Sequence, residues 1–135
     1  MSTRLFNNHE ADDRIMLKKD KLEVGHWTET LEHINEELEF LSAMEDRFLK
    51  DRELYVQLQT IRRENTLKSS ALYRYENAMR NAWECDDMAC DAYYLNNHEK
   101  HRELYTAHIA KYRKIKANVF SKLLLRPKTQ YENAH

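Results

Sequence analysis

Four residues in the C-terminal half of the chain have the types and the spacing of metal ligands. His98 and His101 lie three positions apart, so they share one face if this segment is helical. His108 lies two turns beyond His101, and Asp91 precedes them on the same face. Imidazole and carboxylate groups that face the same way are what a metal site in a helical bundle uses. These four residues are therefore the candidate metal ligands.

The rest of the sequence does not complete a known metal-binding pattern. A carboxylate-bridged di-iron centre needs Glu-x-x-His on two separate helices, and within the predicted helices the one match runs from Glu23 to His26. That match includes Gly25, at the start of the first predicted long helix. We therefore expect neither a bound metal nor another cofactor, and a metal-binding bundle that uses the His98 and His101 face remains the alternative.

The same histidines fit a polar layer within the core of a bundle. With turns near 51 and 85, Lys68 would face His101 and Tyr105, Glu37 would border the same level, and Asn65 would lie one turn away. Buried polar groups at seam positions commonly fix the register or the oligomeric state of packed helices, at a cost in stability. This layer is the interpretation that we prefer for the histidines.

A basic segment near the C-terminus has the composition of a phosphate-binding surface. Lys111–Lys116 holds four basic residues around Tyr112 and Ile115, and further basic residues extend it to position 128. However, the isoelectric point of the whole chain is near 6.7, and Tyr112 and Ile115 belong to a predicted buried stripe. A nucleic-acid adaptor acting through residues 111–128 is thus a second alternative, and we expect no nucleic acid as partner.

Glycine and proline are nearly absent, which excludes several classes of enzyme. The chain has one glycine and one proline in 135 residues. A Walker A loop needs at least two glycines and a dinucleotide-binding loop about three, because the backbone must approach the phosphates closely. The serines also have no marked base and orienting partner in the sequence. We therefore expect no catalytic residues and no enzymatic activity.

Apolar residues recur at spacings of three and four, as in helices that bury one side. The first stripe contains Trp27, Leu31, Ile34, Leu38, Leu41 and Phe48. The second contains Leu54, Leu58, Ile61, Leu72, Tyr75, Met79 and Ala82, with Asn65 and Lys68 at two of its positions. The third contains Asp91, Tyr94, His98, His101, Tyr105, His108, Tyr112, Ile115 and Val119. Together they predict an all-α, antiparallel up-and-down bundle of three long helices, at about 21–49, 52–84 and 87–125.

The turns between these helices can be placed in two ways. The register of the stripes slips near 50–52 and near 84–87, and both slips contain Asp, which begins helices well. Alternatively, the Asn-Thr and Ser-Ser pairs within 65–70 and the Asn-Asn pair at 96–97 could form the turns. The unbroken third stripe speaks against a turn at 96–97, whereas nothing comparable speaks against one at 65–70.

Charge and composition define one domain with two dissimilar ends. We expect a weakly structured segment over 1–20, a helical bundle over 21–126 and a flexible tail over 127–135. Residues 20–53 hold 11 acidic and four basic side chains, whereas residues 100–128 hold nine basic and one acidic. These opposite charges would face each other along the first and third helices. There they would determine which helices pack together more than they would stabilise the bundle.

These observations predict a non-enzymatic helical protein-interaction or scaffold module. Its partner would be another protein or a second copy of the chain, for example in a homodimer. No segment approaches the roughly 20 apolar residues of a membrane span. Cys85 and Cys90 would lie about 140° apart on a helix, which suits neither a disulfide nor a chelate. We therefore expect reduced thiols and a location in the cytoplasm.

Overall fold

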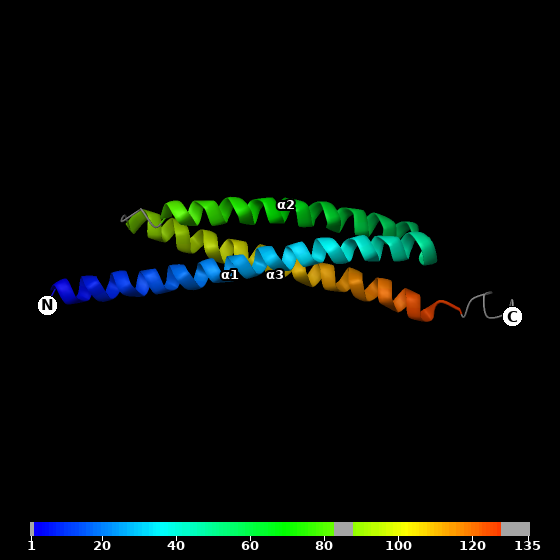
Figure 1. Cartoon of the computed structure of the whole chain (residues 1–135), viewed down its shortest axis with the longest axis horizontal. Helices are drawn as coiled ribbons and strands as arrows, with labels where there is room; N and C mark the ends of the chain where they lie inside the picture. The colour runs from blue at the N-terminus through cyan, green and yellow to red at the C-terminus, as the bar shows by residue number, and fades with distance from the viewer. Residues whose placement is uncertain (1, 83–87, 128–135) are drawn as a thin grey trace.

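The computed structural model describes residues 2–82 and 88–127, and the side chains of 16–79 and 97–127. Its three long helices are α1 (Ser2–Met44), α2 (Arg52–Ala82) and α3 (Met88–Leu125). They run up, down and up, so α1 and α3 point the same way (Figure 1). A π-helical turn, η1 (Glu45–Leu49), follows α1. The predicted all-α bundle of three long helices is confirmed.

The first turn is a short, well-bonded reversal at Lys50 and Asp51. Lys50 adopts a left-handed conformation, with a φ of 46°, and its N–H donates to the carbonyl of Glu45 at 2.7 Å. Asp51 then caps α2, because its carboxylate accepts the N–H of Leu54 at 3.1 Å. The buried Glu45 carboxylate accepts the N–H of Asp51 at 3.2 Å. The turn predicted at 50–52 is therefore confirmed.

The alternative turns at 65–70 and 96–97 are wrong, since α2 and α3 continue through both segments. In α2, the side chain of Asn65 donates to the Leu31 carbonyl of α1 instead of forming a local turn. The Thr66 hydroxyl donates to the Arg62 carbonyl within the same helix. Helix α2 ends at Ala82 and α3 begins at Met88, and the predicted second turn, 84–87, lies outside the described residues. So does the predicted tail beyond Pro127.

Helix α1 begins much earlier than the sequence pattern indicates. It starts at Ser2, whereas the predicted helix started at 21 after a weakly structured segment. Its N-terminal part projects past the end of the α2–α3 pair (Figure 1). Without a neighbouring helix, no strong apolar stripe is required there, and no glycine or proline before Gly25 interrupts the hydrogen-bonding pattern. The weak apolar stripe before residue 21 therefore reflects the absence of a neighbouring helix and does not mark where α1 begins.

Most of the predicted stripe residues whose side chains the structure describes are buried in the core, whereas Lys68, His101 and Tyr105 are only partly buried. The buried hydrophobic residues are Val24, Trp27, Leu31, Ile34, Leu38, Leu41, Leu54, Leu58, Ile61, Leu72, Tyr75, Met79, Tyr112, Ile115 and Val119. Phe48 was predicted to belong to the first stripe but is exposed, while Glu45 takes a buried position. The π-helical turn explains this difference, because it rotates the residues that follow relative to the face of α1. No described helix is both long enough and apolar enough to cross a membrane.

Candidate functional site

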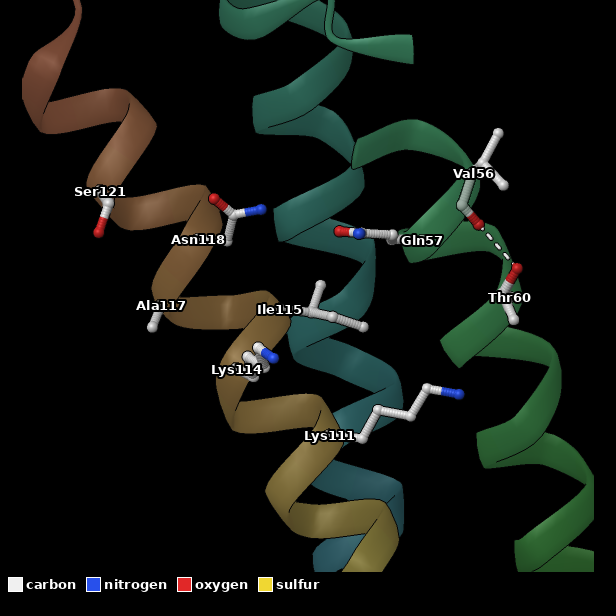
Figure 2. A pocket seen from close by; sticks show the side chains of 9 residues that line it. All are labelled: Val56, Gln57, Thr60, Lys111, Lys114, Ile115, Ala117, Asn118 and Ser121. Carbon is white, nitrogen blue, oxygen red and sulfur yellow. Dashed lines mark hydrogen bonds between the residues drawn. The ribbon is translucent and has the colours of Figure 1, made fainter. Parts of the chain in front are cut away.

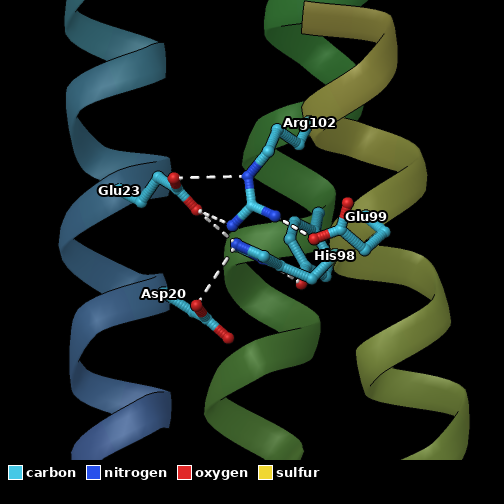
Figure 3. Close-up of polar contacts among 6 residues, drawn as sticks. Asp20, Glu23, His98, Glu99 and Arg102 are labelled. Carbon is cyan, nitrogen blue, oxygen red and sulfur yellow. Dashed lines mark hydrogen bonds and ion pairs between the residues drawn. The ribbon is translucent and has the colours of Figure 1, made fainter.

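His98 joins all three helices near the end of the bundle that contains the second turn. The ring is buried, with Nδ1 2.7 Å from the Tyr75 hydroxyl of α2. Its Nε2 lies 2.6 Å from Oε1 of Glu23 and 3.4 Å from Oδ1 of Asp20, both on α1 (Figure 3). Trp27 stacks on one side of the ring, with centroids 5.3 Å apart. We call Asp20, Glu23, Tyr75, His98 and Arg102 the His98 network.

The surroundings of the His98 ring indicate where its protons lie. Nε2 faces two carboxylate oxygens, which only accept hydrogen bonds, so Nε2 carries a hydrogen and donates to Glu23. Nδ1 then accepts the hydroxyl hydrogen of Tyr75 in the neutral ring. Each helix thus supplies one partner of a single hydrogen-bonded chain.

Arg102 of α3 completes the His98 network on its solvent side. Its Nη2 donates to Oε1 of Glu23 at 2.7 Å and its Nε donates to Oε2 at 3.4 Å, while Nη1 also contacts Glu99 (Figure 3). Burial acts to raise the pKa of Glu23, but the hydrogen bonds from Arg102 and His98 outweigh it and lower the pKa below its usual value. Glu23 is therefore an ionised acceptor with strong donors on both sides.

The carboxylates of this network converge with His98 as metal ligands would. One atom each from Asp20, Glu23 and His98 lies within 4.8 Å of the others, and imidazole nitrogen with carboxylate oxygen suits zinc and similar ions. An ion would have to replace the hydrogen on Nε2 of His98 and compete with Arg102 for Glu23. The residues can supply three ligands, but their present contacts already satisfy them.

The other predicted ligands do not join this cluster. His101 is partly buried and stacks on Tyr75, with ring centroids 4.2 Å apart. Burial, followed by the charges of His98 and Lys100, lowers its pKa. His108 lies in a different layer, and the side chain of Asp91 lies outside the described residues.

His108 forms a second polar layer in the middle of the bundle. Its Nε2 lies 2.9 Å from Oδ1 of Asn65, and the Asn65 amide donates to the Leu31 carbonyl at 2.9 Å. The layer again connects all three helices, but its partners are uncharged. Nδ1 of His108 is buried and has no hydrogen-bond partner in the described part of the chain. Burial, then the charge of Lys68, lowers the pKa of His108 to about 4.

Glu37 of α1 forms a third layer with α3. Its carboxylate accepts one hydrogen bond from the Tyr112 hydroxyl and another from Nζ of Lys116, at 2.8 Å. The hydrogen bonds from Lys116 and Tyr112 lower the pKa of Glu37. The pKa of Tyr112 is raised by its burial and by its hydrogen bond to the charged Glu37. The expected position of Glu37 beside His101 is therefore wrong. Because α1 and α3 are parallel, Glu37 lies further along the bundle than Glu23 and meets a later part of α3.

Three lysines of the basic segment pair with acidic residues of the bundle. Lys111 pairs with Glu64 at 2.8 Å, Lys116 with Glu37 at 2.8 Å, and Lys122 with Asp51. Tyr112 and Ile115 are buried, as their stripe predicted. The opposite charges of α1 and α3 meet in the ion pairs of Lys116 with Glu37 and of Arg102 with Glu23.

A groove of about 750 Å³ separates the first half of α2 from the second half of α3. Gln57 of α2 and Asn118 of α3 point toward each other across it, above Ile115 (Figure 2). Its lining combines apolar groups, amides, hydroxyls and the side chains of Lys111 and Lys114. Its lining residues include no carboxylate, thiol or imidazole.

An apolar edge lies where the C-terminal ends of α1 and α3 run side by side. Phe40, Phe48, Phe120 and Leu124 are exposed there by 69%, 49%, 40% and 86%. Met44, partly buried, packs against the core between Phe40 and Phe48. We call these five residues the phenylalanine edge. Every phenylalanine side chain that the structure describes belongs to it, and none lies in the core.

Sequence reasoning identified His98 but missed its partners. Asp20 lies seven residues before Trp27, and Tyr75 lies on the second stripe, so both could have been placed on seam-facing sides. Arg102 carried no such signal, since it lies beside the third stripe and not on it. The phenylalanine edge was missed because Phe48 matched the seam spacing.

Comparisons with known protein families, with curated proteins and with solved structures find no match. The fold and the geometry of these side chains are thus the basis for the function proposed below.

Proposed function

We propose that this protein is a non-enzymatic helical interaction module that binds a protein through the phenylalanine edge. The observation that carries the proposal is the position of Phe40, Phe48 and Phe120, all at least 40% exposed at one end of the bundle. Phenylalanine has no polar atom that favours contact with water, and grouped exposed apolar side chains mark interaction sites. Aromatic residues are also enriched in the cores of protein interfaces.

The polar layers support a role in which the bundle presents a rigid surface. The His98 network and the layer formed by His108, Asn65 and the Leu31 carbonyl each contain groups from all three helices, so each layer fixes how the helices align. Helices held in one register keep the side chains of neighbouring helices at fixed separations. An interaction surface made of two helices requires this property.

The proposal can be tested by photo-crosslinking in cells that express the chain. p-Benzoylphenylalanine would replace Phe120 in one variant and Tyr55 in a matched control, since these rings are 40% and 42% exposed. We expect a discrete crosslinked product from position 120 and not from position 55. No product from either position, or the same products from both, would contradict the proposal.

Metal binding is the second candidate function, and the convergence of Asp20, Glu23 and His98 favours it. The test is the metal content of untagged protein after dialysis against a mild chelator. A metal-binding bundle would retain about one ion per chain, lose it in His98→Leu and keep it in His101→Leu. Background metal in all three proteins would leave the His98 network as an internal polar contact.

A further inference from the structure

We propose that the phenylalanine edge binds an acidic amphipathic helix of a partner protein. This inference rests on the proposed function and adds the chemistry of the partner.

Two contacts show that the apolar side chains of α1 and α3 lie at the same level. Glu37 contacts Lys116, and the Phe48 ring lies 4.9 Å from the guanidinium carbon of Arg126. Phe40 comes one turn after Glu37, and Phe120 one turn after Lys116. The phenylalanines of the two parallel helices therefore face the same side of the molecule at neighbouring heights.

The spacing within α1 and α3 gives the edge two rows of apolar side chains. Phe40 and Met44 of α1 are four residues apart, as are Phe120 and Leu124 of α3, and side chains four apart form a ridge on an α-helix. Phe48, in the π-helical turn, follows the first row and is placed beside α3 by its contact with Arg126. A third helix with apolar residues at intervals of three and four can pack its own ridge against these two rows.

Basic groups surround this edge. The Nζ of Lys116 lies 5.9 Å from the Phe120 ring centroid, and Arg126 lies over Phe48. Arg47 is exposed and follows Phe40 by two turns, and Arg113 is exposed and precedes Phe120 by two turns. Glu37 pairs with Lys116, and Glu36 is exposed one turn before Phe40, but Arg47, Arg113 and Arg126 outnumber it, so the net charge along the edge is positive. A partner helix that carries acidic residues beside its apolar ridge would be complementary.

The same charges argue against two other occupants. A second copy of the chain would bring its own Lys116 and Arg126 against those of the first, and like charges at an interface are unfavourable. An anionic membrane would also have to approach Glu36, exposed one turn before Phe40, and the acidic outer face of α1.

The experiment uses the full chain and two labelled probe peptides in fluorescence anisotropy titrations. Both peptides are 18-residue amphipathic helices with leucine at intervals of three and four; one carries glutamate at the flanking positions and the other lysine. We expect the acidic peptide to bind at least about tenfold more tightly, with an affinity that falls as salt rises. Equal binding, or tighter binding of the basic peptide, would overturn the inference and leave the proposed function standing.

Matched variants locate the binding. Phe40→Ser should weaken binding of the acidic peptide about tenfold, whereas Leu22→Ser, at a leucine of the same helix that is 76% exposed, should leave it unchanged. The double variant Lys116→Gln, Arg126→Gln should reduce the salt dependence. Circular dichroism melts check that each variant is folded. Equal weakening by Phe40→Ser and Leu22→Ser would overturn the inference.

Two further outcomes would also overturn it. One is a concentration-dependent dimer in sedimentation velocity that Phe40→Ser abolishes, because the occupant would then be a second copy. The other is binding to vesicles of phosphatidylserine and phosphatidylcholine that the acidic peptide does not displace. A crosslink from position 120 without binding of either peptide would reject the acidic helix while supporting a protein partner.

Discussion

His98 and His108 are both buried histidines of α3, ten residues apart, but their surroundings differ in charge. His98 contacts the carboxylates of Asp20 and Glu23, which remain partly exposed, and Arg102 approaches from the solvent side. His108 contacts the neutral amide of Asn65 in the middle of the bundle. Charged partners are thus used where water can still reach them, and a neutral partner where it cannot.

The largest expected effect of this difference is a loss of stability in mild acid through His108. Its pKa is about 4 in the folded protein and near 6.5 in the unfolded chain, so the unfolded state binds more protons between these values. The free energy of unfolding therefore falls as the pH is lowered from 6.5 toward 4, by about 3 kcal/mol over the whole window. Around His108, Lys68 and Lys111 favour the neutral ring and Glu64 opposes them. Urea unfolding at pH 7, 6, 5 and 4.5 measures this loss.

A variant without the titrating ring provides the control for this measurement. In the double variant Asn65→Leu, His108→Leu, most of the pH dependence between 6.5 and 4.5 should disappear. A small dependence in the same direction should remain from His101, whose pKa is also lowered by burial. An unchanged slope would show that His108 does not titrate as its surroundings imply.

The next largest effect is expected when the neutral layer loses one partner. Asn65→Ala removes the acceptor of the His108 N–H and leaves that buried donor without a partner, which should cost about 2 kcal/mol. The double leucine variant should lie close to the wild type at pH 7, because replacing both polar partners is far less costly than removing one. Asn118→Ala, at a partly exposed asparagine of α3, should change the free energy of unfolding by less than about 0.5 kcal/mol.

Only part of the difference between these layers could be predicted from the sequence. The seam positions of His98, His108 and Asn65 followed from helical spacing, because residues three and four apart share a face whatever lies opposite. What lies opposite depends on the turns, and the π-helical turn with a left-handed Lys50 sets the offset between α1 and α2. Glu37 was therefore placed at the level of His101, although the structure places it at Tyr112.

The ends of the elements were predictable where a side chain fixes them. Asp51 caps α2, as the Asp at the register slip predicted. The start of α1 had no such marker, because a helix that projects without neighbours needs neither an apolar stripe nor a particular cap. Arg102 and the phenylalanine edge escaped prediction for a related reason. Their importance lies in contacts or exposure that the seam spacing does not encode.

A smaller effect is expected when the charged layer loses its charge. Glu23→Gln keeps an oxygen that can accept from His98 but removes the ionised partner of Arg102, so the cost should be about 1 kcal/mol at pH 7. Because the folded protein holds the pKa of Glu23 below its usual value, this contribution is present above pH 4.5 and is lost as the pH falls through the lowered pKa. Chemical unfolding of both proteins at pH 7 and pH 3 compares the two conditions.

Glu29→Gln is the matched control for this change. Glu29 is on the same helix and is exposed, and its Oε1 lies 3.9 Å from Nε2 of His33. Its replacement should alter the free energy of unfolding by less than about 0.5 kcal/mol at both pH values. If Glu23→Gln changed the free energy of unfolding as little as this control, the negative charge of Glu23 would not be needed for the contacts with Arg102 and His98 to hold the helices together.

The smallest expected effect is a gain in stability at the one glycine, which lies in α1 between the two layers. A methyl group added at Gly25 would meet no atom within 4 Å, and its backbone is helical. Alanine lowers the entropy of the unfolded chain relative to glycine, so Gly25→Ala should stabilise the protein by about 0.5–1 kcal/mol. The change leaves the contacts of His98 and His108 in place, and it should raise the unfolding free energy equally at pH 7 and pH 5. A gain at only one pH would mean that the backbone of α1 adjusts to the protonation of one layer, so that the two layers are coupled through that helix.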